Sequence, residues 1–313
     1  MNATPSIVPS PCTGVCRLDE ATGFCLGCGR SAGEIAEWAQ AGGERRRAIW
    51  SELPERFAQL DITVTRLPWA RPEITTFVRK TIADRAGTWV IGCHGGTAEF
   101  MAAPDEPMSM TAGPEEIVAT TEQGGLRFRP RDNFRALQWR DPRMPDQTRA
   151  IFIVIPRPRI DASVSGGLKI EGADNDALQT EHRNDALFDL GLGRDHMRFL
   201  VRTDKAELQH ALTRAQGLPL DAVLARCGGL LMQESPTRVV DSAFGRIEVY
   251  APIPLPGGKS PPGPHTHLLP GHLAMQRATA PSVDLPDAYA LCATFYPRSQ
   301  PEDDDCLTRA KAG

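Results

Sequence analysis

Hydrophobic residues repeat along this chain at two spacings, and the spacings separate helical from extended segments. Near the N-terminus they recur every three or four residues, as at Ile49, Leu53 and Phe57, which is the period of an α-helix. Beyond about residue 88 they gather into short runs between turns that contain Gly or Pro, a pattern typical of strands. Ile151–Ile155 is apolar at every position, so it is expected in the centre of a sheet, buried on both faces.

Helix-end signals add detail to this pattern. Ser31 and Glu34 stand three residues apart, as in a capping box at a helix N-terminus. A second helix is expected from about Glu44, with a kink or restart at Pro54, because proline has no backbone N–H to donate. Asp204 is expected to cap a later helix.

The other elements alternate irregularly between helix and strand. Further helices are expected at 72–87, 176–189 and 219–227. Strands are expected at 88–93, 97–101, 117–121, 126–129, 197–203, 230–233, 246–251 and 289–296. Runs of strands interrupted by few helices favour an α+β fold over a regular βαβ alternation.

These patterns divide the chain into three parts. Residues 1–58 are expected to form a small four-cysteine metal-binding helical module, and residues 59–297 a larger mixed α+β domain. Residues 298–313, which include three consecutive aspartates, are expected to be a disordered tail. The module has few apolar residues, so its thin core is expected to need a bound metal ion for stability.

Four of the eight cysteines lie close together near the N-terminus. Cys12, Cys16, Cys25 and Cys28 have the spacing C-x3-C-x8-C-x2-C, in which each pair can grip one ion from a single turn. Thiolates alone satisfy zinc, the cofactor expected here, and they equally satisfy an iron–sulfur cluster, which is the alternative. A third interpretation is that the four cysteines are buried side chains without a metal.

Three segments of this region carry a family resemblance: SPCTGVCRLD from residue 10, GFCLGCGR from residue 23 and EIAEW from residue 34. Residues 10–57 resemble the bacterial family called domain of unknown function 1289, which is described as an iron–sulfur or zinc protein. The resemblance implies that the four cysteines are metal ligands, and it implies no enzymatic activity. The segment WVIGCHGGTAEF from residue 89, together with 124–128, resembles an uncharacterised bacterial family to which no function is attached.

A second group of candidate ligands lies in the proline-rich segment PPGPHTHLLPGH, residues 261–272. His265 and His267 are two residues apart, so an extended backbone would place both imidazoles on one face and could present them to a metal ion. We expect this segment to line the main pocket of the larger domain. The alternative is that the histidines cap a helix and satisfy buried carbonyl groups. His272 could join them as a ligand from the next turn, and a third or fourth ligand would come from Cys93, His94 or Glu99.

Composition and charge narrow the class of protein. A net charge of −4, from 35 basic and 39 acidic residues, argues against a nucleic-acid or anionic-membrane surface, because both rely on concentrated Lys and Arg. The longest apolar run is too short to span a membrane, and the N-terminus lacks a signal-peptide pattern. A cytoplasmic protein is therefore expected, with a small molecule or a protein as its partner.

Three functions fit these observations. The first is a metal-binding protein in which the four-cysteine site is joined to a ligand-binding domain. The second is a metal-dependent enzyme whose active site includes His265 and His267, with His94 as a further candidate. The third is a redox or metal sensor that holds a labile cluster on its N-terminal cysteines. Whether the protein is an enzyme stays open at this point.

Overall fold

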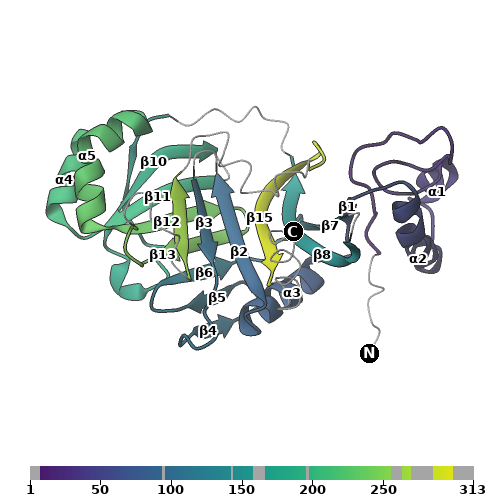
Figure 1. Ribbon diagram of the computed structural model, residues 1–313, viewed down its shortest axis with the longest axis horizontal. Coiled ribbons are helices and arrows are strands. Elements are labelled where there is room, and N and C mark those ends of the chain that lie inside the picture. The colour runs from purple at the N-terminus through teal and green to yellow at the C-terminus, as the bar shows by residue number, and fades with distance from the viewer. Residues whose placement is uncertain are drawn as a thin grey trace, which may run out of the picture.

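Two antiparallel sheets make up the body of the protein, with helices at both ends (Figure 1). The structure is a computed structural model, and it describes residues 8–93, 96–141, 144–157, 166–194, 197–254, 263–268 and 285–298. The architecture is α+β, as the sequence predicts. Within these ranges no helix is both long enough and apolar enough to cross a bilayer.

One buried carboxylate joins the two N-terminal helices. They are α1 (Ala32–Glu37) and α2 (Gly43–Gln59), and α2 runs through Pro54 without the expected restart. The predicted capping box is confirmed: Ser31 Oγ accepts from the Glu34 backbone (3.2 Å), and the Ser31 backbone donates to Glu34 Oε2 (2.9 Å). Arg56 of α2 holds the same carboxylate with both terminal nitrogens, at 2.6 and 3.1 Å. Glu34 therefore caps one helix and ties it to the next.

The first sheet has seven strands and carries the candidate ligands of the larger domain. Its neighbours all run antiparallel. The order is β1 (Val64–Arg66), β7 (Arg135–Asp141), β8 (Met144–Pro156), β15 (Tyr289–Pro297), β2 (Gly87–Cys93), β3 (Gly96–Phe100) and β14 (His265–Leu268).

The second sheet has eight strands and faces the first. Strands β12 and β13 lie against β2 and β3 across the space between the sheets. The order is β4 (Ser109–Ala112), β5 (Ile117–Thr120), β6 (Gly124–Phe128), β13 (Gly245–Val249), β12 (Thr237–Ser242), β11 (Met197–Thr203), β10 (Ala186–Arg194) and β9 (Lys169–Ala173).

The helices of the larger region extend the core between the sheets. Each of them places buried apolar side chains in that core. In Figure 1, α4 and α5 lie at the end of the molecule opposite to α1 and α2. These helices are α3 (Arg71–Ala83), α4 (Ala206–Arg214) and α5 (Leu220–Glu234), and a 3₁₀ turn, η1 (Thr180–His182), precedes β10.

Trp89 on β2 is at the centre of the core. Its side chain is 1% exposed, and it stacks on Phe244 with ring centroids 5.0 Å apart. Phe295 of β15 lies 5.1 Å away, and Trp89 Nε1 donates to Thr81 Oγ1 of α3 at 3.1 Å. One tryptophan thus joins the two sheets and a helix, and its only polar atom is satisfied.

Strand β8 confirms the expectation of a central strand buried on both faces. Ile151 and Ile153 belong to the core between the sheets. Phe152 and Val154 belong to a second apolar cluster on the opposite face. The continuous apolar run in the sequence therefore reflects burial on two sides, as in a strand without a solvated face.

Three local predictions are wrong. The helix at 176–189 is instead a turn followed by β10, where Phe188 and Leu190 alternate into the core with the period of a strand. The strand at 230–233 belongs to α5, because Cys227 and Leu231 continue its buried helical face. Asp204 does not cap α4; it forms an exposed ion pair with Lys205, which is the N-cap residue.

The outer face of the eight-stranded sheet buries a balanced group of charges. Asp174 and Glu248 lie between Arg202 and Arg246, and no side chain of the four is more than 3% exposed. Arg202 is 2.9 Å from Asp174 and 2.8 Å from Glu248, Arg246 is 2.7 Å from Glu248, and Arg246 also pairs with Asp174. Two positive and two negative groups compensate one another here, so removing one charge leaves a buried excess.

This arrangement predicts a large difference between two Asp→Asn substitutions. Asp174→Asn should lower the free energy of unfolding by about 3 kcal/mol, because Glu248 is then the one fully buried carboxylate beside two buried guanidinium groups. Asp241, which lies 3.8 Å from Arg246, is partly exposed and compensates less. The matched control, Asp204→Asn, removes an exposed ion pair and should cost less than about 1 kcal/mol. Denaturant unfolding of both full-length variants measures the difference, and equal losses would contradict this account of the charge group.

Candidate metal centres

The two cysteine-bearing loops of the N-terminal module lie against each other. Thr13 Oγ1 donates to the Gly27 carbonyl oxygen at 2.9 Å. A Cβ on Gly27 would come within 2.5 Å of that hydroxyl and 2.6 Å of Val15 Cβ, so only glycine permits this approach. The loop holding Cys12 and Cys16 therefore packs directly on the loop holding Cys25 and Cys28.

Hydrogen bonds to sulfur surround three of the four thiols. The Gly14 backbone donates to Cys12 Sγ and Arg30 Nε donates to Cys28 Sγ, each at 3.4 Å. Burial raises the pKa of the Cys25 thiol, but hydrogen bonds from backbone N–H groups outweigh burial and leave that pKa below its ordinary value. Such donors stabilise thiolates, which are the form that binds metals.

The four sulfurs stand as two pairs. The thiols of Cys12 and Cys16 interact electrostatically, as do those of Cys25 and Cys28. The thiols of Cys16 and Cys25 interact electrostatically across the two loops, and no disulfide links any of them. No three of these sulfurs lie within 4.8 Å of one another, so the pairs are neighbours without a closed tetrahedral arrangement.

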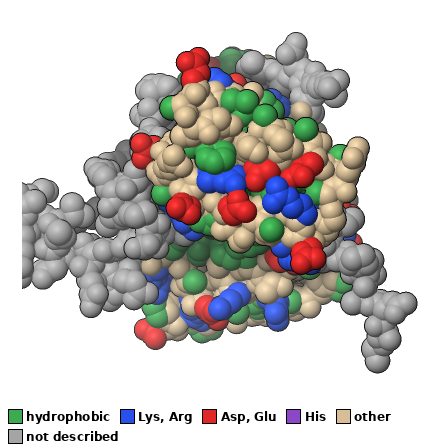
Figure 2. All heavy atoms as spheres, turned by 90° about the vertical axis from the view of Figure 1, so that its right-hand side faces the viewer, with side chains coloured by type: hydrophobic (Ala, Val, Ile, Leu, Met, Phe, Trp, Pro, Cys, Tyr) green, Lys and Arg blue, Asp and Glu red, His purple; other side chains and the backbone are tan. Residues whose placement is uncertain are grey.

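Two of the three consecutive arginines of α2, Arg45 and Arg46, make contacts within the module. Arg45 pairs with Glu37 at 2.8 Å, and Arg46 donates to the carbonyl oxygen of Trp38 at 3.2 Å. Acidic and basic side chains are mixed on the face that carries the module, rather than gathered by sign (Figure 2). This face has the character of a solvated surface and not of a phosphate-binding patch.

In the larger region, His265, His267 and Glu99 come together on two adjacent strands. His265 is paired with Glu99 in the register of β14 and β3, and the two imidazole centroids are 4.7 Å apart. Nε2 of each histidine lies 3.5 Å from one carboxylate oxygen of Glu99. Among the described residues this is the one set of three ligating side chains whose donor atoms lie within 4.8 Å of one another.

Strand alternation determines the face on which this group lies. Ala98 and Phe100 of β3 point into the core, so Glu99 between them points to the outer face of the seven-stranded sheet. His265 and His267 share that face, as the sequence predicts. Their side chains are 14% and 15% exposed and that of Glu99 is 23% exposed, so the group is partly accessible.

The start of β14 is anchored by its backbone and by its inward-facing side. Gly263 has a φ of 96°, which favours glycine, and its carbonyl oxygen is 2.8 Å from Nδ1 of His265. Arg238 Nε donates to Thr266 Oγ1 at 3.4 Å from the opposite face. A histidine whose Nδ1–H is held by a carbonyl directs its Nε2 lone pair outward, which is the orientation of many metal ligands.

Tyr296 adds a phenol near this group that sequence reasoning did not identify. Burial, and then the negative charge of Glu99, raise the pKa of Tyr296 to about 12. The phenol therefore keeps its proton at neutral pH. The strand pattern predicts that Tyr296 lies on a strand but not that this strand is separated from Glu99 by β2 alone, because the order β15, β2, β3 exists only in the folded sheet.

The structure does not describe the side chains of the other candidate ligands of this group, and the described cavity does not lie at the histidine-bearing segment. His94 and the side chain of Cys93 lie outside the described part of the structure, as do residues 269–272. The described cavity lies between α2 and strands β1 and β7, and residues 263–268 do not line it. Glu99 is thus the expected third ligand that the structure places beside both histidines.

Comparison with known proteins identifies two families. Residues 10–57 match the model of a protein of unknown function, DUF1289, which confirms the resemblance of the cysteine-bearing segment. Residues 73–308 match the model of a family of unknown function, DUF6925. No curated protein and no solved structure matches the chain. Because the second match spans well over half of its length, the chain belongs to the DUF6925 family and carries a DUF1289 segment in front of it.

Proposed function

We propose that this protein binds two metal ions, one at the four N-terminal cysteines and one at Glu99, His265 and His267. The observation that carries the proposal is the convergence of three ligating side chains within 4.8 Å on the outer face of one sheet. Two imidazole nitrogens and one carboxylate form a ligand set that divalent transition metals favour.

The contacts of His265 support a cation at this position. With its Nδ1–H donated to Gly263, the neutral imidazole would direct a lone pair at a carboxylate oxygen 3.5 Å away. Two lone pairs facing each other repel, so a positive charge between Glu99 and His265 is favoured. Either a proton on the imidazole or a shared metal ion can supply that charge. A measurement of metal binding distinguishes between these two cations.

The N-terminal site is proposed as a structural zinc site. In α1 and α2 the fully buried apolar side chains are Ile49 and Leu53, and the buried thiols of Cys25 and Cys28 complete this small interior. So small a core is insufficient for folding without a further link, which a tetrahedral site of four thiolates provides. An iron–sulfur cluster is the alternative occupant, and it would colour the protein.

A metal-dependent enzyme is the second candidate function, and the ligand count favours it. Three protein ligands leave at least one coordination position for water or substrate, as in catalytic rather than structural sites. Tyr296 is a protonated phenol beside Glu99 and could orient a group bound there. The chain's own part would be to bind and orient; the metal ion, when bound, would act as a Lewis acid.

Substitution of the histidines should remove one metal equivalent. Wild-type protein loaded with Co²⁺ should bind two equivalents, and His265→Ala/His267→Ala should bind one, with a melting temperature nearly unchanged because both side chains are partly exposed. His210→Ala, on the exposed face of α4, is the matched control and should keep two. Metal analysis after gel filtration measures the stoichiometry. A double variant that keeps two equivalents but melts earlier would show that the histidines are structural.

Substitution of the cysteines should have a different spectroscopic and structural effect. Cys25→Ser/Cys28→Ser should abolish the thiolate-to-cobalt charge-transfer band while leaving the histidine-dependent equivalent in place. Hydrogen exchange should accelerate in α1 and α2 and remain slow in β2 and β8, because only the module loses its link. Cys227→Ala, a buried thiol of α5, is the control and should keep the band. Unchanged exchange in α1 and α2 would argue against a structural site.

A further inference from the structure

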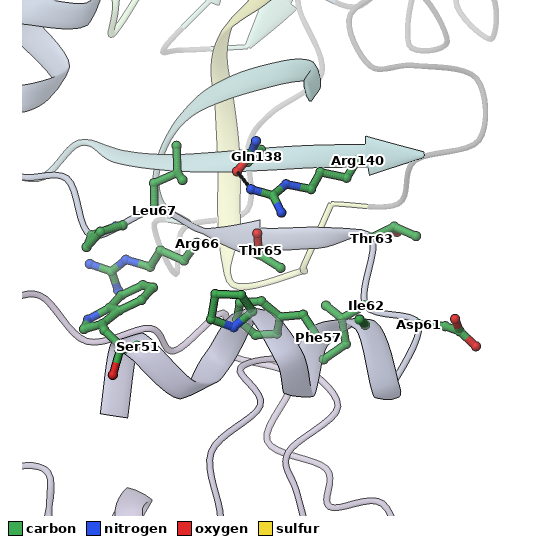
Figure 3. A pocket seen from close by; sticks show the side chains of 14 residues that line it. Ser51, Phe57, Asp61, Ile62, Thr63, Thr65, Arg66, Leu67, Gln138 and Arg140 are labelled. Carbon is green, nitrogen blue, oxygen red and sulfur yellow. Dashed lines mark hydrogen bonds between the residues drawn. The ribbon is translucent and has the colours of Figure 1, made fainter. Parts of the chain in front are cut away.

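The described cavity separates helix α2 from strands β1 and β7. It has a volume of about 550 Å³, within the range of small-molecule sites. Figure 3 shows the helix on one side and the two strands on the other, with side chains from both directed into the space between them. The cavity thus lies where the cysteine-bearing module meets the sheet.

The side of the cavity formed by α2 is apolar and rich in rings. Trp50, Pro54 and Phe57 line it from the helix, and Ile62 continues the same surface. Rings of this kind offer broad, rigid contact to a flat apolar body. This side of the cavity therefore favours an aromatic ligand.

The opposite side contains a buried cation that has no carboxylate partner. Arg66 of β1 lines the cavity and is 8% exposed, and the charged or polar groups that act on it, among the described residues, are Tyr289, Arg135 and Cys12, none of them a carboxylate. Its Nη1 donates to the Cys12 carbonyl oxygen at 3.3 Å, and its enclosed Nε has no hydrogen-bond partner.

The other polar groups of the cavity add to its positive character. Arg140 of β7 is exposed at the rim and donates to Gln138 Oε1 at 3.2 Å (Figure 3). Asp61 is the acidic residue of the lining, and Figure 3 shows its carboxylate pointing away from the space. A ligand in the cavity would therefore meet two guanidinium groups and no inward-facing carboxylate of the lining.

We propose that this cavity binds an aromatic monocarboxylate, with its ring against Phe57 and Pro54 and its carboxylate toward Arg66 and Arg140. A buried guanidinium without a counter-charge is unfavourable, and a ligand carboxylate compensates it with charge-assisted hydrogen bonds. A monoanion matches the single buried positive charge, whereas a phosphate dianion would bring a second charge into an apolar space. This inference does not depend on metal binding.

Calorimetric titration of the full chain with naphthalene-2-carboxylate tests the proposal. The acid should bind at least roughly 10-fold more tightly than naphthalene-2-carboxamide, which has the same shape without the charge. Arg66→Met should weaken the acid roughly 10-fold or more and bring its affinity close to that of the amide. Arg140→Gln, at the exposed rim, should weaken it by a few fold, and the matched control Arg79→Gln on the exposed face of α3 should change nothing.

The outcomes separate the proposal from its rivals. If the acid does not bind, if acid and amide bind equally, or if Arg66→Met retains full affinity, the site is not a carboxylate site. Tighter binding of 2-naphthyl phosphate than of the acid would also overturn the assignment. Should Arg66→Met fail to fold, the contrast between acid and amide on the wild-type chain, together with Arg140→Gln, still decides the question.

Discussion

The packing of Trp89 between the two sheets is the interaction on which the rest of the structure depends. Its ring contacts Phe244, in the turn between β12 and β13 of the opposite sheet, and Phe295 of the neighbouring strand, and its nitrogen donates to Thr81 of α3. Because side chains alternate along a strand, this contact determines which face of β2 turns inward. Through pairing it also determines the inward face of β3. If the register of β3 against β2 were shifted by one residue, Glu99 would point into the core and would be separated from both histidines.

The sequence predicts those elements whose signals are local. The capping box at Ser31, the period of the second helix and the doubly buried run of β8 all depend on residues a few positions apart. The wrong predictions of secondary structure arise where the apolar residues fit both the period of a helix and that of a strand. Residues 176–189 can be arranged on a helix face, but pairing of β10 with β9 and β11 stabilises the strand, and that pairing involves distant residues.

The candidate sites also combine features that the local sequence predicts with features that depend on contacts between distant residues. Two histidines spaced for one face of a strand are visible in the sequence, whereas the choice of Glu99 as their neighbour requires the pairing of β14 with β3 across a large gap in the chain. The cavity has no sequence signal at all. Arg66 is one arginine among many, and its lack of a carboxylate partner becomes evident only when Cys12, Tyr289 and α2 surround it.

The carbonyl oxygen of Cys12 links two regions that have been described separately. It accepts hydrogen bonds from Arg66 at 3.3 Å and from the Tyr289 hydroxyl at 2.9 Å, while the same residue carries the first thiol of the module. Any displacement of that peptide is felt by the cysteine loop and by the wall of the cavity together. If a ligand in the cavity changes the affinity of the cysteines for a metal ion, then the metal ion must change the affinity of the cavity for that ligand by the same factor. If both proposed sites are occupied, this one peptide group joins the cysteine loop of the DUF1289 segment to the wall of the cavity.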